Sequence, residues 1–483
     1  MKRRFITTLG VVSLAAMCAL AASPVRSQNR NPNNPYLYTT GSWGQTYRDQ
    51  WGHWKVGLTP MGGGNSAWDI ETGQDNPVVV AFIDTGLDYL HPQIARANVW
   101  INPNPNTKRS GGDQNRYVDD LMGWNFVDGD NNPWDNDGHG TFTAGIVAAT
   151  INDGQGIAGI NRGVKIMPLR VLNFLGRGQA AQIIPAIIYA ADHGAKIINM
   201  SIEQDMAMRS QGLQWAVDYA YKKGVLVVVA AGNQGLDTST TSPSGLNHVL
   251  TVAGTDIHDK RLGFSNWGPS IRISAPAEEI LSLRARKTDM LVMFGEKEYV
   301  KRRAMLGPDA KYYHATGTSF AAPFVTGVAS LILAKNPNLT PEQVEHMLLM
   351  SADDIESPGW DQLTGYGRLN ARKALEADPN YYLYCEVHKL TPAKDDNGAD
   401  VVKVLGTVRG SSLDHYEVQL GQANQDVSTY KKLAEKSGKS VDSGLIANFP
   451  VSEISSQGEW VVRVIAYDSA GKMRESRNSM KVE

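Results

Sequence analysis

Three polar residues that lie far apart in the chain are of the types that acyl transfer requires. They are Asp84 in VVVAFIDTGLD, His139 in DNDGHGTFTAG and Ser319 in GTSFAAPFVTG. A serine hydroxyl becomes a nucleophile when a histidine within hydrogen-bond reach accepts its proton and a carboxylate fixes the tautomer of that histidine. Singly, the three have commoner structural explanations, as a turn carboxylate, a satisfied histidine and a helix N-cap. Together they predict a catalytic Asp-His-Ser triad.

The serine opens a helix-like run, GTSFAAPFVTGVASL (317–331), that also contains Pro323. A proline breaks a helix interior but is tolerated close to the start, where little helical hydrogen bonding is lost. The N–H groups of a first helical turn are unpaired, so the Ser319 N–H would be free to donate to an oxyanion. We therefore expect the start of this helix to present Ser319 to a substrate, and its apolar remainder to be buried.

A second candidate oxyanion donor is Asn233, which follows a strand-like run in VVVAAGNQG (227–235). An asparagine here would ordinarily form a turn. A side-chain amide that points into a cleft would instead stabilise the transition state by about 3–4 kcal/mol.

Between residues 78 and 378, strand-like apolar runs alternate with amphipathic helix-like segments. The strand-like runs are 78–83, 164–172, 195–200, 225–230 and 249–254, and the helix-like segments are 140–150, 178–194, 212–224, 319–335 and 341–350, the last with Thr340 as its N-cap. Strands that are apolar on both faces indicate a parallel sheet covered by helices on both sides. Catalytic groups gather at the carboxyl ends of such strands, where Asp84 stands. The predicted fold class is α/β, with a mostly parallel sheet.

The sequence changes character after residues 378–380. Polar and apolar residues then alternate by twos, with turn residues between the runs, over 381–390, 400–408, 413–421 and 459–471. This pattern predicts an all-β sandwich of the immunoglobulin or fibronectin kind over 380–483. We assign 61–379 to the catalytic domain, and 28–60 to an N-terminal arm that lies over this larger body.

Residues 1–27 combine a basic start, a short apolar stretch and small residues before a polar segment, which predicts a signal peptide and export to the periplasm or the medium. Removal of the signal leaves Cys385 as the one cysteine, so no internal disulfide is expected. The 47 Lys and Arg residues nearly balance the 49 Asp and Glu residues, so no global field favours a nucleic-acid partner. No later segment looks long enough for a stable membrane span.

Four motifs, FIDTGLDYLHP, DGHGTFTAG, AAGN and GTSFAAPFVTG, follow one another in an order that resembles the subtilisin family of serine peptidases. The order Asp, His, Ser differs from those of chymotrypsin and the α/β-hydrolases. The resemblance covers roughly residues 50–378 and implies a subtilisin-like fold and a serine endopeptidase that works through an acyl-enzyme near neutral to alkaline pH. It implies Asp84 as the orienting carboxylate, His139 as general base and then acid, and Ser319 as nucleophile. Asn233 and the Ser319 N–H would form the oxyanion hole, and the chemistry would need no cofactor.

The resemblance also implies a cleft for protein or peptide substrates, in which an extended peptide pairs with two segments as an added strand. The residues that would line it are Ser201, Ile202, Glu203, Ala230, Ala231 and Gly232. Glu203 stands where the family usually has a glycine. We hypothesise that it narrows the cleft or favours basic substrate residues; the plain alternative is a side chain that points to solvent.

Subtilisins commonly bind calcium, which implies a structural ion here. Asp128, Asp130 and Asn132 supply hard oxygens at alternate positions of a Gly- and Asn-rich loop, as Ca²⁺ prefers. The alternative is an acidic surface loop without an ion. At a second position, the family often has an aspartate ligand where this chain has Gln93, which argues against an ion there.

Three other functions agree less well with the sequence. The motifs FIDTG (82–86) and VDSG (441–444) match aspartic peptidases, but α/β alternation is wrong for that all-β class. A lipase or esterase would need Gly-x-Ser-x-Gly, and Ala321 replaces the last glycine. A non-enzymatic scaffold that binds through its sandwich would be expected to have lost a catalytic position. The β-sandwich is expected to bind a partner that the sequence does not identify, because fold alone assigns no function.

Overall fold

The computed structural model describes residues 32–59, 66–106, 115–203, 210–286, 288 and 305–482. The predicted signal peptide, 1–27, lies outside the described residues. The central feature is a seven-stranded sheet in the order β2-β3-β1-β4-β5-β6-β7, in which every pair of neighbours is parallel. Its strands are β1 Val79–Asp84, β2 Trp124–Asn125, β3 Lys165–Arg170, β4 Ile197–Met200, β5 Leu226–Ala230, β6 Val249–Thr255 and β7 Ile271–Pro276.

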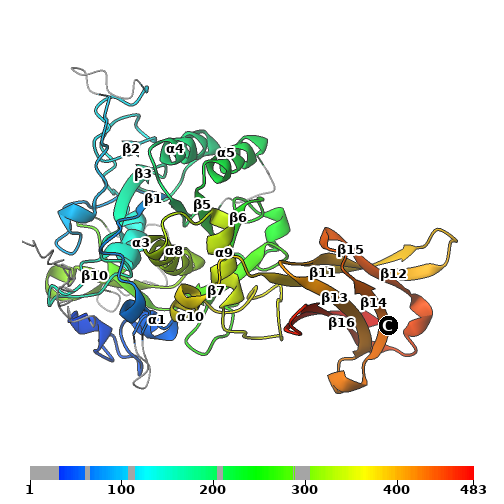
Figure 1. The fold of residues 1–483 in the computed structure, drawn as a ribbon. Coiled ribbons are helices and arrows are strands. Elements are labelled where there is room, and N and C mark those ends of the chain that lie inside the picture. Colours follow the sequence, from blue (N-terminus) through cyan, green and yellow to red (C-terminus); the bar gives the residue numbers. More distant parts are fainter. Residues whose placement is uncertain are drawn as a thin grey trace, which may run out of the picture. The chain divides into compact units, whose positions relative to one another are not determined.

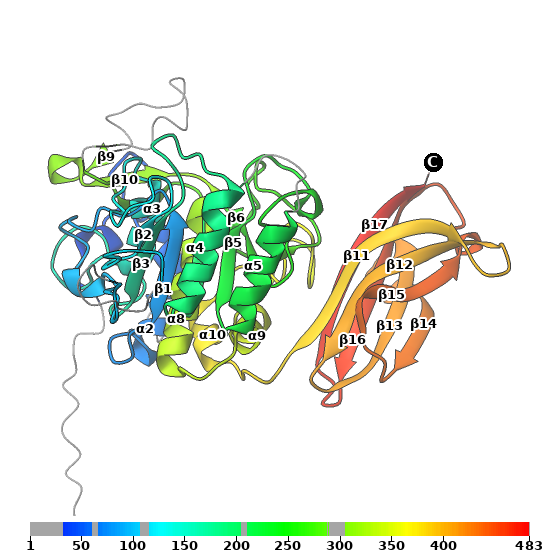
Figure 2. The same ribbon diagram turned by 90° about the horizontal axis from the view of Figure 1, so that it is seen from above.

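Helices cover both faces of this sheet (Figures 1 and 2). Along β1, Val80 and Phe82 belong to one buried apolar cluster, whereas Ala81 and Ile83 belong to another. The second cluster includes side chains of α4 (Ala180–Asp192) and α5 (Gln211–Lys222), and the first includes those of α3 (His139–Ala148) and α8 (Thr318–Lys335). The predicted α/β class and the predicted strands and helices are confirmed. Strands β2 and β7 of this sheet were not predicted.

Helix α8 runs through the protein core. It has 18 residues and a mean hydropathy of 1.4, so by length and composition it could cross a membrane, contrary to the sequence-based expectation. In this structure, 89% of the helix is buried inside the protein. Beside it lie α9 (Pro341–Met350) and α10 (Ala371–Glu376). Thr340 caps α9 as predicted, since its side chain accepts a hydrogen bond from Gln343 N.

The N-terminal arm is part of the core. Leu37, Trp51, Val56 and Leu58 are all buried within the cluster that contains α3 and α8. The arm includes α1 (Trp51–Lys55), and α2 (Ala67–Ile70) follows it. A separate three-stranded sheet, in the order β8-β10-β9, consists of β8 Ile280–Leu283, β9 Met305–Leu306 and β10 Tyr312–Ala315. Short 3-10 helices are η1 Pro35–Leu37, η2 Arg96–Asn98, η3 Thr238–Thr240, η4 Pro308–Ala310, η5 Val427–Thr429 and η6 Val451–Glu453.

The C-terminal region is all-β, as predicted. Its strands are β11 Leu383–Lys394, β12 Asp400–Gly410, β13 Leu413–Gln422, β14 Lys431–Ser437, β15 Val441–Pro450, β16 Gly458–Asp468 and β17 Met473–Val482. They form antiparallel sheets in the orders β11-β12-β15 and β14-β13-β16-β17, with a shared apolar core. Cys385 is buried in that core as a free thiol. Strands β14, β15 and β17 were not predicted, and the domain limits proposed from the sequence stay predictions.

Candidate active site

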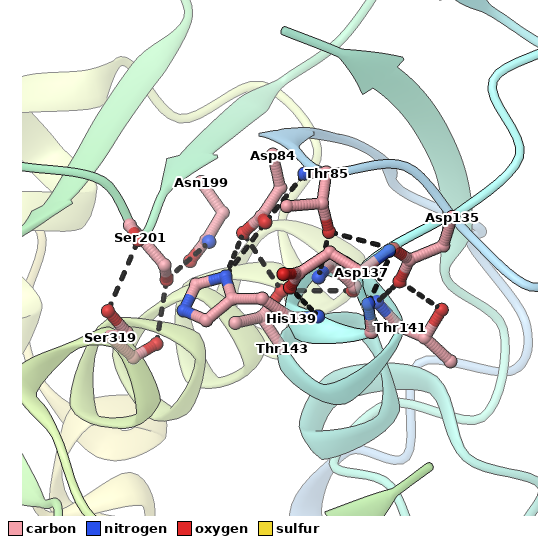
Figure 3. Close-up of polar contacts among 12 residues, drawn as sticks. Asp84, Thr85, Asp135, Asp137, His139, Thr141, Thr143, Asn199, Ser201 and Ser319 are labelled. Atoms are coloured by element: carbon pink, nitrogen blue, oxygen red, sulfur yellow. Dashed lines mark hydrogen bonds and ion pairs between the residues drawn. The ribbon is translucent and has the colours of Figure 1, made fainter. Parts of the chain in front are cut away.

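The structure brings the predicted base and its carboxylate together (Figure 3). Asp84 is the last residue of β1, and His139 is the first residue of α3. The imidazole Nδ1 lies 2.8 Å from Asp84 Oδ1 and 3.0 Å from Oδ2. Both side chains are buried, with exposed fractions of 5% for His139 and 0% for Asp84. A carboxylate at Nδ1 fixes the proton there, which leaves Nε2 as the acceptor that a general base needs.

A network of threonine and aspartate side chains holds this pair in place. Thr85, next to Asp84, donates to Asp135 Oδ1 at 2.9 Å and accepts from Gly140 N at 2.8 Å. Asp135 also accepts from Gly138 N and from both donors of Thr141 at 2.6–2.9 Å. The end of β1 is thus tied to the start of α3. Sequence reasoning missed Asp135 and Thr85, although both lie inside the motifs that identified the triad.

The surroundings of His139 favour its protonated form. Burial alone would lower the pKa of the imidazole, but the charge and hydrogen bond of Asp84, with Asp137 and Asp135 nearby, raise the pKa to about 9. The same burial raises the pKa of Asp137 to about 6. His139 therefore gives up its proton at a higher pH than an ordinary imidazole does.

Ser319 is the second residue of α8, where the helix supplies no acceptor for its N–H. Its hydroxyl donates to Ser201 O at 3.2 Å, and its carbonyl accepts from Ser201 Oγ at 2.7 Å. Within the described part of the chain no hydrogen bond joins Ser319 Oγ to His139, although Figure 3 shows the second ring nitrogen of His139 directed toward it. Catalytic hydrogen bonds often form only once substrate is bound.

Pro323 explains why the Ser319 carbonyl is available. In an α-helix that carbonyl would accept from the N–H four residues later, and a proline there has none. The Ser201 hydroxyl takes its place, and Ser201 Oγ itself accepts from Asn199 Nδ2 at 3.0 Å. Asn199 in turn accepts from Thr326 Oγ1 at 2.9 Å, so the end of β4 is locked onto α8.

The amide of Asn233 has a fixed orientation. Its Oδ1 accepts from Thr318 N at 2.9 Å and from Thr318 Oγ1 at 3.1 Å. Because the oxygen is held there, Nδ2 is directed elsewhere, and among the described residues it makes no hydrogen bond. The Asn233 side chain is half-buried and contacts Thr318, the residue directly before Ser319. This arrangement suits the predicted second oxyanion donor.

Of the predicted substrate-lining residues, Ala230 is the last residue of β5, and the others follow the ends of the neighbouring strands β4 and β5. Ala231 N donates to Val252 O at 2.9 Å and Ala231 O accepts from Asn266 Nδ2 at 2.9 Å. Gly232 N donates to Thr318 Oγ1 at 3.1 Å, and Gly232 O accepts from Asn266 N at 2.9 Å. The backbone groups of Ala231 and Gly232 thus already have hydrogen-bond partners within the protein, and their pairing with an extended peptide stays a prediction. Ala230 lies within β5, paired with Val252.

The two predicted residues that directly follow β4, Ser201 and Ile202, are buried, with exposed fractions of 3% and 6%. Glu203 is exposed, but its side chain does not simply extend into solvent. Its carboxylate accepts from Asn233 N and, at 2.6 Å, from Gln234 Nε2. Glu203 thus joins the end of β4 to the loop after β5.

The predicted calcium loop does not fit an ion in its present arrangement. Asp128 Oδ2 accepts from Arg170 at 2.8 Å and from Asn125 Nδ2 at 2.9 Å. Asp130 Oδ1 accepts from Asn125 Nδ2 at 2.9 Å and from Asn132 N at 3.0 Å. A guanidinium thus supplies the positive charge beside Asp128. The described residues contain no group of three or more His, Cys, Asp or Glu side chains that could hold a metal.

A second oxygen cluster lies beside Gln93, and amide nitrogens fill it. Asn34 Nδ2 lies 3.0 Å from Asp153 Oδ1 and 2.6–3.0 Å from three carbonyl oxygens, those of Thr150, Gln155 and Ile157. Gln93 Nε2 donates to Asp153 Oδ2 at 2.6 Å. Backbone N–H donors fix both amides, because Asn34 Oδ1 accepts from Asn152 and Gln93 Oε1 from Ile157. Donor groups thus occupy the place that a cation would need, so a calcium ion does not fit here either.

Comparison with known proteins agrees with this architecture. The model of the subtilase family matches residues 75–367. The chain is 34% identical over 309 residues to the thermophilic serine proteinase of Bacillus sp. (strain AK1), a match that covers 64% of each protein. It is 32% identical to thermitase of Thermoactinomyces vulgaris, over 71% of this chain and 99% of thermitase.

Other relatives are longer or are known as structures. The match to the cell wall-associated protease of Bacillus subtilis (strain 168), at 31% identity, covers 75% of this chain but 39% of that protein. A protease structure from Pseudoalteromonas arctica PAMC 21717 aligns with a TM-score of 0.55 and 26% identity, over 71% of this chain and 98% of that one. With the family model matched over its α/β region and its fold shared with these peptidases, the chain belongs to the subtilase family.

Proposed function

We propose that this protein is a serine endopeptidase that hydrolyses peptide bonds through an acyl-enzyme. The observation that carries the proposal is the buried Asp84–His139 pair, whose free ring nitrogen is directed toward Ser319 at the start of α8. Membership of the subtilase family supports the same reaction class.

In the acylation step, Ser319 Oγ attacks the carbonyl carbon of the scissile bond while His139 Nε2 accepts the hydroxyl proton. Asp84 keeps the other ring proton on Nδ1 and stabilises the imidazolium that forms. The substrate oxygen becomes an oxyanion that accepts from Ser319 N–H and Asn233 Nδ2. The C–N bond then breaks, and His139 gives its proton to the leaving amine.

In the deacylation step, water takes the place of the departed amine. His139 Nε2 accepts a proton from this water as the oxygen attacks the ester carbon, and the same two donors hold the second oxyanion. The bond to Ser319 Oγ breaks, the hydroxyl regains the proton from His139, and the carboxylic acid product leaves.

Substrate, location and further partners are parts of the same proposal. Protein and peptide substrates follow from the peptidase reaction. The relatives include proteins named extracellular basic protease and cell wall-associated protease, which supports export by the predicted signal peptide over 1–27. A partner for the C-terminal β-sandwich stays a prediction from the sequence. Comparison of periplasmic, cytoplasmic and medium fractions tests the export proposal.

Labelling of the purified protein with a fluorescent, serine-reactive phosphonate tests the reaction. We expect wild type to be labelled and both Ser319→Ala and His139→Ala to lose the label, since the first lacks the nucleophile and the second its base. Ser239→Ala, at an exposed serine outside the site, is the matched control and should be labelled like wild type. A folded wild-type protein that takes no label would refute the proposal.

A further inference from the structure

The Glu203 side chain joins two segments that flank the nucleophile. Glu203 follows β4, and its Oε2 accepts from Asn233 N while its Oε1 accepts from Gln234 Nε2 at 2.6 Å. A methyl group built on Gly232 would lie 2.7 Å from Glu203 Oε2. The carboxylate therefore lies directly against the Gly232 α-carbon, beside the residue that carries the oxyanion donor.

The same two segments flank the reacting hydroxyl. On one side, Ser201 O accepts from Ser319 Oγ at 3.2 Å. On the other, Asn233 Oδ1 accepts from Thr318 N at 2.9 Å, one residue before the nucleophile. A substrate carbonyl oxygen held by Asn233 Nδ2 and Ser319 N–H would lie beside Asn233, whose backbone N–H donates to Glu203 Oε2. The residue that supplies this carbonyl is therefore brought close to the Glu203 carboxylate.

The charge at this position discriminates between substrates. A lysine or arginine side chain that reaches Glu203 gains a charge-assisted hydrogen bond to the carboxylate, a stronger contact than one between neutral groups. An aspartate or glutamate meets a like charge, which penalises the wrong partner. Gly232 has φ +105°, a conformation that favours glycine, so no side chain of its own fills the space that Glu203 takes.

We propose that Glu203 makes this peptidase selective for substrates with lysine or arginine at the residue that supplies the scissile carbonyl. The inference rests on the proposed endopeptidase function and assigns its substrate class. A purely structural role, in which Glu203 only fastens the loop of Asn233, is the competing explanation. The two explanations differ in one readout. If Glu203 selects by charge, loss of its charge changes the ratio of kcat/KM between substrates; if its role is structural, kcat/KM falls by the same factor for all substrates.

The test uses the full-length protein and three fluorogenic peptides that differ only at this residue, with lysine, methionine or glutamate. For wild type we expect kcat/KM for the lysine peptide to exceed that for methionine by about 10- to 100-fold, the range of one hydrogen bond to a charged group. In Glu203→Gln the lysine-to-methionine ratio should fall toward one. In Glu203→Lys the glutamate peptide should become preferred over the lysine peptide. Glu459→Gln, at an exposed carboxylate on β16, is the matched control and should keep the wild-type ratio.

Equal cleavage of the lysine and methionine peptides by wild type would overturn the inference, and so would a Glu203→Gln variant that loses activity on all three peptides with the ratio intact. Phosphonate labelling of the same samples distinguishes failure of the specificity proposal from failure of the proposed function. Labelled protein without a lysine preference refutes the specificity alone, whereas protein that neither labels nor cleaves any peptide refutes the proposed function.

Discussion

Ser201 and Ser319 exchange hydrogen bonds across the junction of β4 and α8: Ser201 Oγ donates to Ser319 O at 2.7 Å, and Ser319 Oγ donates to Ser201 O at 3.2 Å (Figure 3). The first bond replaces the helical one that Pro323 cannot make. The second holds the nucleophile until a substrate arrives. Ser201, the residue after β4, thus contacts both the backbone and the side chain of the proposed nucleophile.

Removal of the Ser201 hydroxyl should loosen this junction. We expect Ser201→Ala to lower the free energy of unfolding by about 1 kcal/mol, the net contribution of one hydrogen bond, and to lower kcat because the start of α8 is less well fixed. Thermal unfolding and peptide kinetics measure the two effects. Ser201→Thr, which keeps a hydroxyl, is the control. A Ser201→Ala protein equal to wild type in both measurements would show that the exchange contributes nothing.

Activity should rise with pH into the alkaline range. Protonated His139 cannot accept the Ser319 proton, and its pKa is raised to about 9, so log kcat/KM should climb with a slope near one and level off above about pH 9. Since the pKa is raised above the ordinary 6.5, the Asp84–His139 pair contributes stability that is fully present below pH 6.5 and lost as pH rises through about 9. A pH–rate profile of a neutral peptide measures the first effect. A plateau that begins near pH 6 would contradict it.

Asp84→Asn separates the two roles of the carboxylate. Without its charge the pKa of His139 should fall, which moves the rise in the pH profile to lower pH. The plateau value of kcat should nevertheless drop by about 10⁴-fold, because the amide no longer fixes the productive tautomer. A profile whose midpoint stays near that of wild type would show that Asp84 does not set the pKa.

Loss of the Asn233 amide should weaken stabilisation of the transition state and leave substrate binding in the ground state nearly unchanged. We expect Asn233→Ala to lower kcat by about 10²- to 10³-fold with little change in KM. Asn233→Asp keeps the acceptor for Thr318 N but lacks the donor, so it should lose as much activity while keeping the fold. Steady-state kinetics with circular dichroism as the folding control decide this. Full activity in either variant would remove Asn233 from the oxyanion hole.

Replacement of an amide by a carboxylate should create a calcium response. In Asn34→Asp an oxygen would replace the nitrogen that now contacts Asp153 and three carbonyl oxygens. This variant should unfold at lower temperature than wild type in EDTA and recover stability in millimolar calcium, since bound ligand stabilises the folded state. Wild type and Asp128→Asn should show no such response at this cluster. A wild-type Tm that falls on chelation, and no longer falls in Gln93→Ala, would place an ion there after all.

The sequence predicted the elements whose apolar pattern is strong and missed those whose position depends on distant partners. Strands such as β1 and β5 are buried on both faces, so their residues are apolar throughout. Strand β14 has the sequence KKLAEKS and mostly exposed side chains at the edge of its sheet, and a polar edge strand has little periodic signal.

The same distinction applies to the candidate site. The triad and Asn233 lie in short contiguous motifs, and short motifs are visible in a single sequence. The bonds that occupy Ala231 and Gly232 come from Val252, Asn266 and Thr318, which lie 21 or more residues away in the chain. Likewise, the Asp128 carboxylate is paired with Arg170, 42 residues later, which no local pattern of acidic residues reveals. Contacts between side chains that are distant in the chain and meet only after folding could not be predicted from the sequence.

Burial of the N-terminal arm affects how fast copies of this protein would cleave one another. A peptidase can cleave its own copies, and segments near a chain terminus are preferred sites of proteolytic nicking. Here Leu37 and Trp51 are packed into the core, and Asn34 is bound by loop 150–157, so this stretch must first open locally before another copy could bind it as an extended peptide. Autolysis at the arm would then follow the free energy of that opening, and mutations such as Leu37→Ala would shorten the working life of the enzyme without touching its chemistry.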